Sequence, residues 1–261
     1  ENKLTSGSEI QLLPVPASVT IPVSQHIGAP AEIAVVKDEK VRAGQVIARS
    51  RGFVSANIHS SVSGKVSKID SVIDASGYKQ TAIFITVEGD EWVETIDRSS
   101  EIITGVNLTS EEIVKRCLES GIVGLGGATF PSHVKMTVPA GKRCDVLIIN
   151  GVECEPFLTS DHRLMLERGE EILTGVSILM KALQVSRAMI GIENNKQDAV
   201  AHMTRLATAF EGITVHALKV KYPQGAEKQL IKALINREVP SGKLPLDVNT
   251  VVHNVGTAFA V

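Results

Sequence analysis

The feature that most constrains the fold is an alternation of strand-like and helix-like segments in the second half of the chain. Strand-like runs at 146–149, 188–192 and 213–218 alternate with helical patterns at about 160–183, 195–210 and 226–236. The run at 146–149 is apolar without interruption, which is typical of a strand covered on both faces. Strands that alternate with helices favour a parallel sheet. The sequence therefore predicts a parallel α/β domain, entered through a helix that a Thr109–Glu112 capping box begins and Gly121 ends.

The first ninety residues show a different pattern, which predicts β structure. Short β-branched runs at 19–21, 33–36, 46–48 and 82–87 are separated by Gly, Pro, Ser or Asp. A V-x-x-G-x-x-I turn at 41–47, followed by Gly64-x-Val66, resembles the barrel-sandwich hybrid of lipoyl and biotinyl carrier domains. Those carriers present a modifiable lysine in a hairpin, and the matching segment 52–57 contains none. We therefore expect the scaffold without the carrier function, over residues 1–95, with the α/β domain over 96–261.

Composition excludes several classes of protein. Lys and Arg number 27 against 29 Asp and Glu, and this balance disfavours nucleic acid as the main partner. No apolar run approaches the ~20 residues that span a bilayer, so a soluble chain is expected. The three cysteines form no CxxC pair, and no histidine spacing indicates a metal site or a Ser-His-Asp triad. The apolar end at 258–261 suggests a fragment of a longer protein.

The glycine-rich segment 124–131 carries the strongest functional signal. Gly124, Gly126 and Gly127 let the backbone approach a ligand and expose N–H groups to an anion. Pro131 can begin a helix, and Lys135 would add a positive charge one turn later. The segment is not the dinucleotide fingerprint, because position 129 is Thr and the segment follows a helix. The structural alternative is a tight turn that packs a helix on the sheet.

Polar residues also follow the predicted strands. Asn150, Glu153 and Glu155 leave the first buried strand at the edge where open α/β sheets bind ligands. The alternative is a polar loop that caps the next helix, in which Cys154 is a small packed residue. A Gly turn at 221–228 and a strand-to-helix turn at 252–257 repeat the pattern, and each is also compatible with a routine connection. The charges of 161–163 are expected on a solvated helix face.

Taken in order, these segments resemble the RnfC family, the NADH-oxidising subunits of Rnf ion-translocating electron-transport complexes. The matching stretches cover nearly the whole chain and lie at 24–30, 121–131, 150–168, 222–230 and 237–242. A more distant likeness is to the flavin-binding subunit of respiratory complex I, which carries similar loops in the same order. The resemblance implies a Rossmann-like α/β domain of the complex I type behind the barrel-sandwich hybrid, with an FMN and NADH site.

The resemblance also implies a role for each residue of the candidate site. Beneath the flavin and its ribityl phosphate it places Gly124, Gly126, Gly127 and Ala128, with Lys135 near the phosphate. Facing the isoalloxazine and the nicotinamide it places Asn150, Glu153 and Glu155, with Phe130 stacked on NADH. The residues that it expects to close the pocket are Gly225, Glu227, Asn254 and Thr257. No catalytic acid or base and no metal ligand is expected, because hydride transfer needs only two rings held in contact.

Some positions depart from the complex I pattern. Leu125 stands where that pattern has Arg, Thr129 where it has Gly, Val152 where it has an acidic residue, and Ala226 where it has Glu. Each change removes a potential ligand contact, so a weaker flavin affinity is expected. Family members continue into a small domain and a ferredoxin-like segment with two cysteine-rich motifs. Iron–sulfur clusters are therefore expected only outside this chain.

The expected function is electron input: hydride passes from NADH to FMN, and electrons then leave toward those clusters. The implied partners are the membrane subunits and the ferredoxin-like subunit of an Rnf complex, with ferredoxin reached indirectly. The implied location is peripheral, on the cytoplasmic side of the bacterial membrane, and ion translocation belongs to the membrane subunits. Two alternatives remain. One is a non-catalytic docking scaffold with a degenerate pocket, and the other is a related electron carrier of cobalamin or proline reductase systems.

Overall fold

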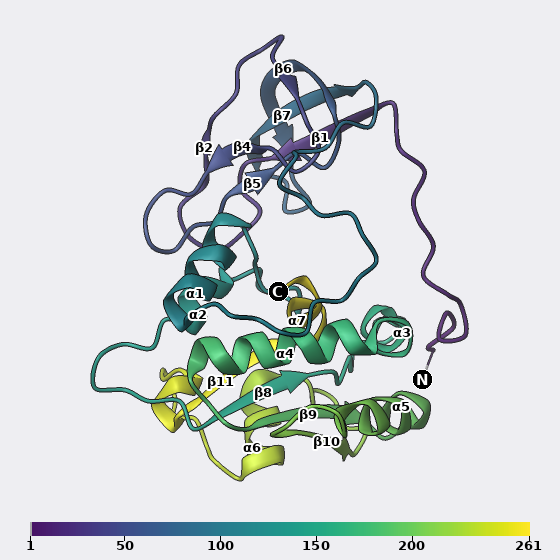
Figure 1. Cartoon of the computed structure of the whole chain (residues 1–261), viewed down its shortest axis with the longest axis vertical. Helices are drawn as coiled ribbons and strands as arrows, with labels where there is room; N and C mark the ends of the chain where they lie inside the picture. The colour runs from purple at the N-terminus through teal and green to yellow at the C-terminus, as the bar shows by residue number, and fades with distance from the viewer. Residues whose placement is uncertain (1) are drawn as a thin grey trace.

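The computed structural model describes residues 2–261, so Glu1, the first residue of the predicted 1–95 domain, lies outside the described residues. A β-rich N-terminal domain stands above an α/β domain in Figure 1. A connection at 88–109 without helices or strands joins the two, and the predicted boundary at 95/96 lies within it and stays a prediction. In residues 2–261 no helix is both long enough and apolar enough to cross a membrane.

The α/β domain is built on a four-stranded parallel sheet, as predicted. Its order is β10 (Ile213–Leu218), β9 (Ala188–Glu193), β8 (Val146–Asn150) and β11 (Thr250–Asn254). All three pairings are parallel, so the four carboxyl ends meet at one edge. The register places Asn150 of β8 directly beside Asn254 of β11.

Helices cover both faces of this sheet, which explains the uninterrupted apolar run of β8. Leu147 and Ile149 point to a core shared with α4 (Gly169–Leu183), α5 (Gln197–Ala207) and α7 (Val255–Ala260). Ile148 points to the opposite face, where α6 (Glu227–Ile235) packs. Successive side chains of a strand alternate between the two faces of the sheet. Since helices cover both faces, all three residues are fully buried. A short helical turn, η1 (Pro245–Val248), precedes β11.

The long helical pattern at 160–183 is two helices instead of one. α3 (Ser160–Glu167) and α4 are separated at Arg168, whose φ of −134° and ψ of 37° are not helical. Gly169 begins α4 in close contact with α5, since a Cβ there would lie 2.6 Å from Leu206 Cδ1. The turn lets α3 pack against α5 while α4 continues along the sheet. The expected helix at 195–210 is likewise shorter at both ends.

Two further helices hold the glycine-rich segment between them. α1 (Ser110–Glu119) begins with the predicted capping box, in which Glu112 N donates to Thr109 Oγ1 and Glu112 Oε2 accepts from Thr109 N. α2 (Ser132–Met136) follows the segment, and Pro131 is its N-cap residue. The segment at 122–131 is therefore a loop between two helices, as the sequence indicates.

The N-terminal domain consists of two small antiparallel sheets. One has the order β1 (Ser18–Pro22), β7 (Lys79–Val87), β6 (Gly64–Ile73) and β3 (Lys40–Val41). The other has the order β2 (Glu32–Ile33), β4 (Val46–Arg49) and β5 (Ile58–His59). Ile47, Val66, Ile83 and Ile85 are fully buried between them. The predicted strands are present, although the one expected at 33–36 is reduced to β2.

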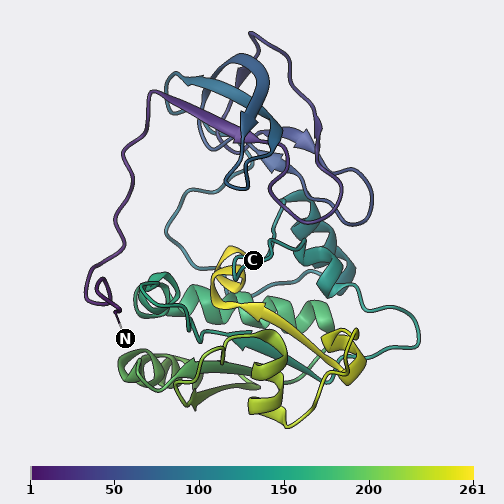
Figure 2. The ribbon, with the colours of Figure 1, turned by 180° about the vertical axis from the view of Figure 1, so that it is seen from behind.

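The first residues form an arm that leaves the N-terminal domain. Figure 2 shows it running from β1 down the side of the molecule to α3 and α5 of the other domain. Apolar residues of the arm remain in solvent, since Leu12 is 97% exposed and Leu13 is 85% exposed. The contacts that hold the arm are polar and lie near Lys3, Ser6 and Ile10.

Candidate functional site

The candidate site forms where β8 and β11 end. Asn254 Nδ2 donates to the carbonyl oxygen of Asn150 over 3.3 Å, and Asn254 Oδ1 accepts from Gly256 N over 2.8 Å. The second bond caps the N-terminus of α7, as Asn does at many helix starts. Asn254 therefore joins three elements, and its position at the carboxyl edge matches the general location of ligand sites in open α/β sheets.

The glycine-rich loop is fixed to this edge at two points. Leu125 N donates to Thr257 Oγ1 of α7 over 2.9 Å. A Cβ on Gly126 would lie 2.8 Å from Asn254 Cβ, closer than real Cβ contacts, so only glycine fits there. Gly124 N closes the loop by donating to Phe130 O over 2.8 Å, and Phe130 is half-buried at the return of the loop. Three predicted motifs thus meet at one place.

The outer face of this loop is open. Gly127 has a φ of +148°, and a Cβ there would meet no atom within 4 Å. Residues Leu125 to Ala128 are exposed, and two of the four have no side chain. Exposed backbone without side chains is what a planar ring or a phosphate needs in order to lie against the chain. The exposed backbone of this loop is therefore chemically suited to bind a flavin nucleotide.

Glu153 directs its carboxylate to the start of α3. Glu153 Oε1 accepts from Asp161 N over 2.7 Å and from Ser160 Oγ over 3.1 Å, and Oε2 accepts from His162 N over 3.2 Å. A carboxylate at a helix N-terminus is favourable because it meets unpaired N–H groups and the positive end of the helix dipole. The helix-capping alternative is therefore present for Glu153, and its contact with a ligand stays a prediction.

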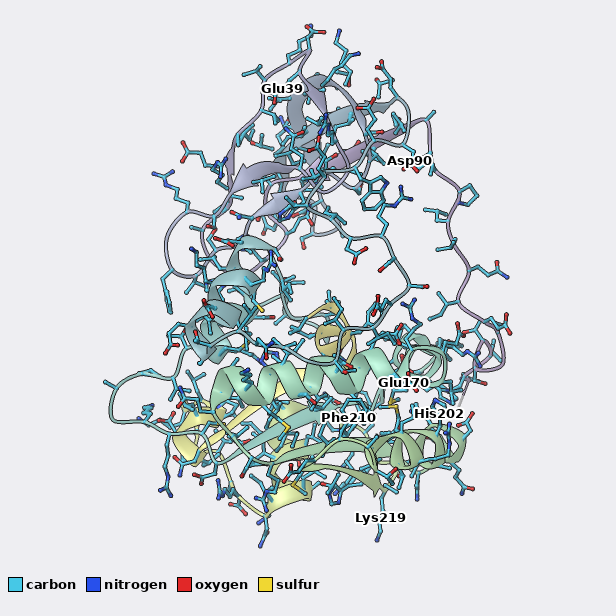
Figure 3. The ribbon with its side chains drawn as sticks, in the orientation of Figure 1. Glu39, Asp90, Glu170, His202, Phe210 and Lys219 are labelled. Atoms are coloured by element: carbon cyan, nitrogen blue, oxygen red, sulfur yellow. The ribbon has the colours of Figure 1, made fainter. Side chains whose placement is uncertain are left out.

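Asn150 and Glu155 join the loop after β8 to the loop after β10. Asn150 Nδ2 donates to Gly225 O over 2.8 Å, and Asn150 Oδ1 accepts from Val152 N over 3.1 Å. Glu155 is exposed, and its Oε1 accepts from the hydroxyl of Tyr222 over 2.8 Å. Both loops follow the carboxyl ends of their strands, and Lys219, which Figure 3 labels, is the first residue after β10. Cys154 packs against the core beside α6, as expected for a small packed residue.

Lys135 and Glu227 form a separate pair. Lys135 Nζ lies 3.0 Å from Glu227 Oε1 and donates to Val252 O of β11 over 2.9 Å. Both groups that were expected to meet a ligand are thus partnered within the protein. Lys135 reaches the rest of the site through Val252 of β11, and Glu227 follows the loop whose Gly225 O accepts from Asn150. The next residue of β11, His253, is buried, and its Nε2 has no hydrogen-bond partner among residues 2–261.

The side chains at 161 and 162 are covered in part, contrary to the expectation of a solvated face for 161–163: Asp161 is half-buried and His162 is buried. Asp161 Oδ2 accepts from Asn254 Nδ2 over 2.7 Å, and burial raises the pKa of Asp161 to about 6. His162 lies 2.9 Å from Asp198. The solvated-face expectation is wrong for His162 and holds only in part for Asp161, because α3 lies between α5 and α7, where its inward face is covered.

The site also contains two lysines that the sequence did not indicate. Lys196 is 3% exposed, lies 3.5 Å from the buried Glu193, and donates to Val152 O over 2.8 Å. Its place three residues after a buried strand, at the start of the next helix, was a signal that could have found it. Lys3 donates to carbonyl oxygens of the 153–158 loop from a segment about 150 residues away in sequence, and no local pattern indicates such a contact.

Comparison with protein-family models gives two matches. Residues 117–261 match the Nuo51 FMN-binding domain of the complex I 51-kDa family, and this match covers more than half of the chain. Residues 1–90 match the RnfC barrel sandwich hybrid domain. The two matches agree with the two folds described above, and the predicted fold class is confirmed.

Curated relatives align along almost the whole chain. It is 50% identical over 99% of its length to the C subunit of a proton-translocating ferredoxin:NAD(+) oxidoreductase complex from Clostridium ljungdahlii, covering 56% of that protein. It is 45% identical over 94% of its length to the C subunit of a Na(+)-translocating ferredoxin:NAD(+) oxidoreductase complex from Acetobacterium woodii, covering 55%. The chain spans about half the length of the curated relatives that it matches.

A solved structure supports the fold of the second domain. The crystal structure of an NAD+-reducing [NiFe]-hydrogenase in the H2-reduced state aligns with a TM-score of 0.51 and 23% identity. The alignment covers 58% of this chain and 30% of the hydrogenase chain. This likeness concerns the fold alone. The two domain matches and the relatives lead to one assignment: the chain belongs to the RnfC family and carries an RnfC barrel sandwich hybrid ahead of a Nuo51-type FMN-binding domain.

Proposed function

We propose that this chain binds FMN and NADH at the carboxyl edge of its parallel sheet and is the electron-input part of a ferredoxin:NAD(+) oxidoreductase complex. The single observation that carries the proposal is the glycine-rich loop, fixed to α7 by Thr257 and left open on its outer face at Gly127. That loop lies within the residues that match the FMN-binding family. The reaction class comes from the ferredoxin:NAD(+) oxidoreductase complexes to which the relatives belong.

The residues of the chain have definite tasks in this proposal. The backbone at 124–128 supports the flavin, while Asn254 and Thr257 hold that backbone at the sheet edge. Glu155 and Tyr222 lie at the exposed side of the loops, where a nicotinamide can approach. When bound, FMN would supply an acceptor that takes two electrons together and releases them singly. The protein contributes the position of the two rings, and no side chain has to transfer a proton.

The wider setting follows from the relatives and is also proposed. Electrons leave toward iron–sulfur clusters outside this chain, and the membrane and ferredoxin-like subunits of an Rnf complex are the partners. The complex places this chain on the cytoplasmic side of the bacterial membrane. The relatives that support this setting are named as subunits of proton- and Na(+)-translocating complexes. The identity of the coupling ion therefore differs among close relatives.

A titration tests the proposal. FMN fluorescence is followed as the chain is added, and NADH is then added without oxygen while the flavin absorbance is recorded. Saturable quenching followed by bleaching is expected. Gly127→Asp should abolish both responses, because it places a charged side chain on the open face of the loop. Gly77→Asp is the matched control, since Gly77 also has a positive φ and open space but lies in the β6–β7 turn.

A non-catalytic scaffold remains the second candidate, and two observations favour it. The carboxylate of Glu153 accepts hydrogen bonds from the first N–H groups of α3, and Lys135 forms an ion pair with Glu227. Two groups that could meet a flavin nucleotide are thus partnered within the protein. The absence of quenching at tens of micromolar, in a chain with a cooperative thermal transition, would favour the scaffold.

A further inference from the structure

The ammonium of Lys3 lies among three backbone carbonyl oxygens of one loop. Lys3 Nζ donates to Glu153 O over 2.7 Å, to Glu155 O over 2.7 Å and to Leu158 O over 2.6 Å. An ammonium has three N–H donors, so each is matched by one acceptor. Lys3 is half-buried, while its neighbour Leu4 is 81% exposed. The arm therefore directs the side chain of Lys3 into the α/β domain.

The loop that receives Lys3 has an unfavourable conformation of its own. Glu153 and Phe157 have φ values of +47° and +68°, in the left-handed region that residues with a Cβ rarely adopt. Such residues persist only where the surrounding structure fixes them. Three carbonyl oxygens that converge on one point also repel one another unless a cation lies between them. Lys196 holds the start of the same loop from inside, through Val152 O.

The arm is attached to the helix that follows the loop. Thr5 and Thr159 share a hydrogen bond of 2.5 Å between their hydroxyls, and Arg163 Nη1 donates to Ser6 O over 3.1 Å. Ile10 N donates to the carboxylate of Glu167 at 3.1 Å and 3.2 Å. These bonds fix residues 5–10 along α3, so that Lys3 reaches the loop just before that helix.

We propose that Lys3 is a positioning residue of the candidate site: its ammonium is a built-in cation that fixes the 153–158 loop and thereby places Glu155 at the sheet edge. The part of this proposal that concerns ligands rests on the proposed function, and the part that concerns the loop does not. Arginine is a poor substitute, because its donors lie in a planar fork and do not converge as those of an ammonium do. The loop carbonyls should instead accept a small free ammonium ion when the lysine is removed.

Amide hydrogen exchange tests the loop. In Lys3→Met, exchange at 153–159 should rise at least tenfold, and Lys3→Arg should give an intermediate increase. Lys79→Met is the control, since Lys79 is an exposed lysine of β7 in the N-terminal domain. Thermal melting of each variant monitors the fold as a whole. Unchanged exchange at 153–159 in Lys3→Met would overturn the proposal, whatever the flavin does.

Rescue by a small cation tests the positioning. Lys3→Ala should bind FMN and NADH at least fivefold more weakly than the parent chain, and ethylammonium should restore most of the affinity and the slow exchange. Tetramethylammonium at the same ionic strength, which has no N–H donor, should restore neither. Rescue by both ions, or a loosened loop with unchanged ligand affinity, would overturn the positioning role. A parent chain that binds no FMN would contradict the proposed function. The exchange measurement would still decide whether Lys3 fixes the 153–158 loop.

Discussion

Gly126 lies where the backbone of the glycine-rich loop comes closest to Asn254. We expect Gly126→Ala to weaken FMN binding at least tenfold, because the added Cβ would lie 2.8 Å from Asn254 Cβ and would move the cap of α7. The free energy of unfolding should fall by about 1–3 kcal/mol, as overpacked sites commonly lose. Gly105→Ala is the control, since Gly105 has no atom within 4 Å of the new Cβ. Equal affinities for the two variants, measured by flavin quenching, would contradict the assigned loop position.

His253 should make stability depend on pH. Burial lowers its pKa from 6.5 to about 3 in the folded chain, with a smaller contribution from Lys135. Between these values the unfolded chain binds the proton and the folded chain does not, so stability is complete above pH 6.5 and falls as the pH decreases. The loss from this group is about 1.4 kcal/mol per pH unit.

His253→Leu removes this titration and also the unpaired Nε2. The variant should therefore lose stability less steeply below pH 6.5, gaining about 2 kcal/mol on the parent chain between pH 6.5 and pH 5. Urea unfolding at half-unit pH steps measures both curves. Parallel curves over this range would show that His253 is protonated in the folded chain.

Among single residues, those with a local signature were the ones that the sequence could indicate. Gly126, Asn150 and Asn254 stand at strand ends or in a glycine cluster, and the structure does bring them together. Lys3 could not be found, because its three acceptors belong to a loop that is distant in sequence. The burial of His162 depends on how α3 packs between other helices, which its own residues do not specify.

At the scale of elements, the crossing of α4 and α7 supports the site from behind. A Cβ on Gly175 of α4 would lie 1.8 Å from Ala258 O of α7, so the two helices touch through backbone. Gly175→Ala must separate them, and we expect a loss of at least ~2 kcal/mol in unfolding free energy. FMN affinity should fall as well, because α7 carries Thr257. Ser177→Ala on the same helix is the control and should cost less than ~1 kcal/mol, with unchanged affinity.

The existence of most elements could be predicted, and their ends could not. The strand at 213–218 and the capping box of α1 were correct in detail, because each depends on residues within a few positions. The break at Arg168 was missed because the helical pattern of the sequence runs on through this position, and it is the backbone angles of Arg168 that separate α3 from α4. β2 is likewise shorter than predicted, although Ala34 N still donates to Ile47 O of β4 over 2.9 Å.

For the whole molecule, the relation between the domains is the feature that the sequence left open. The N-terminal domain contacts the segment that carries the glycine-rich loop: Asn57 Nδ2 donates to Glu119 O over 3.1 Å, and His133 lies 2.9 Å from Phe53 O. Ile27 N approaches Thr129 O at 3.4 Å. The hairpin that bears lysine in carrier domains is thus part of a contact with α2. Family motifs at 24–30 and 121–131 therefore belong to one interface.

Gly121 tests whether this interface supports the site. A Cβ there would lie 2.2 Å from Asn57 O, and the φ of +67° adds strain of about 1–2 kcal/mol. Gly141→Ala is the matched control, because Gly141 has a φ of +80° and no atom within 4 Å of the new Cβ. Compared with Gly141→Ala, Gly121→Ala should therefore show faster amide exchange at 51–57, faster amide exchange at 122–130 and a larger loss of FMN affinity. If both variants lose only the shared strain energy, the N-terminal domain does not hold the loop in place, and the site is a property of the α/β domain alone.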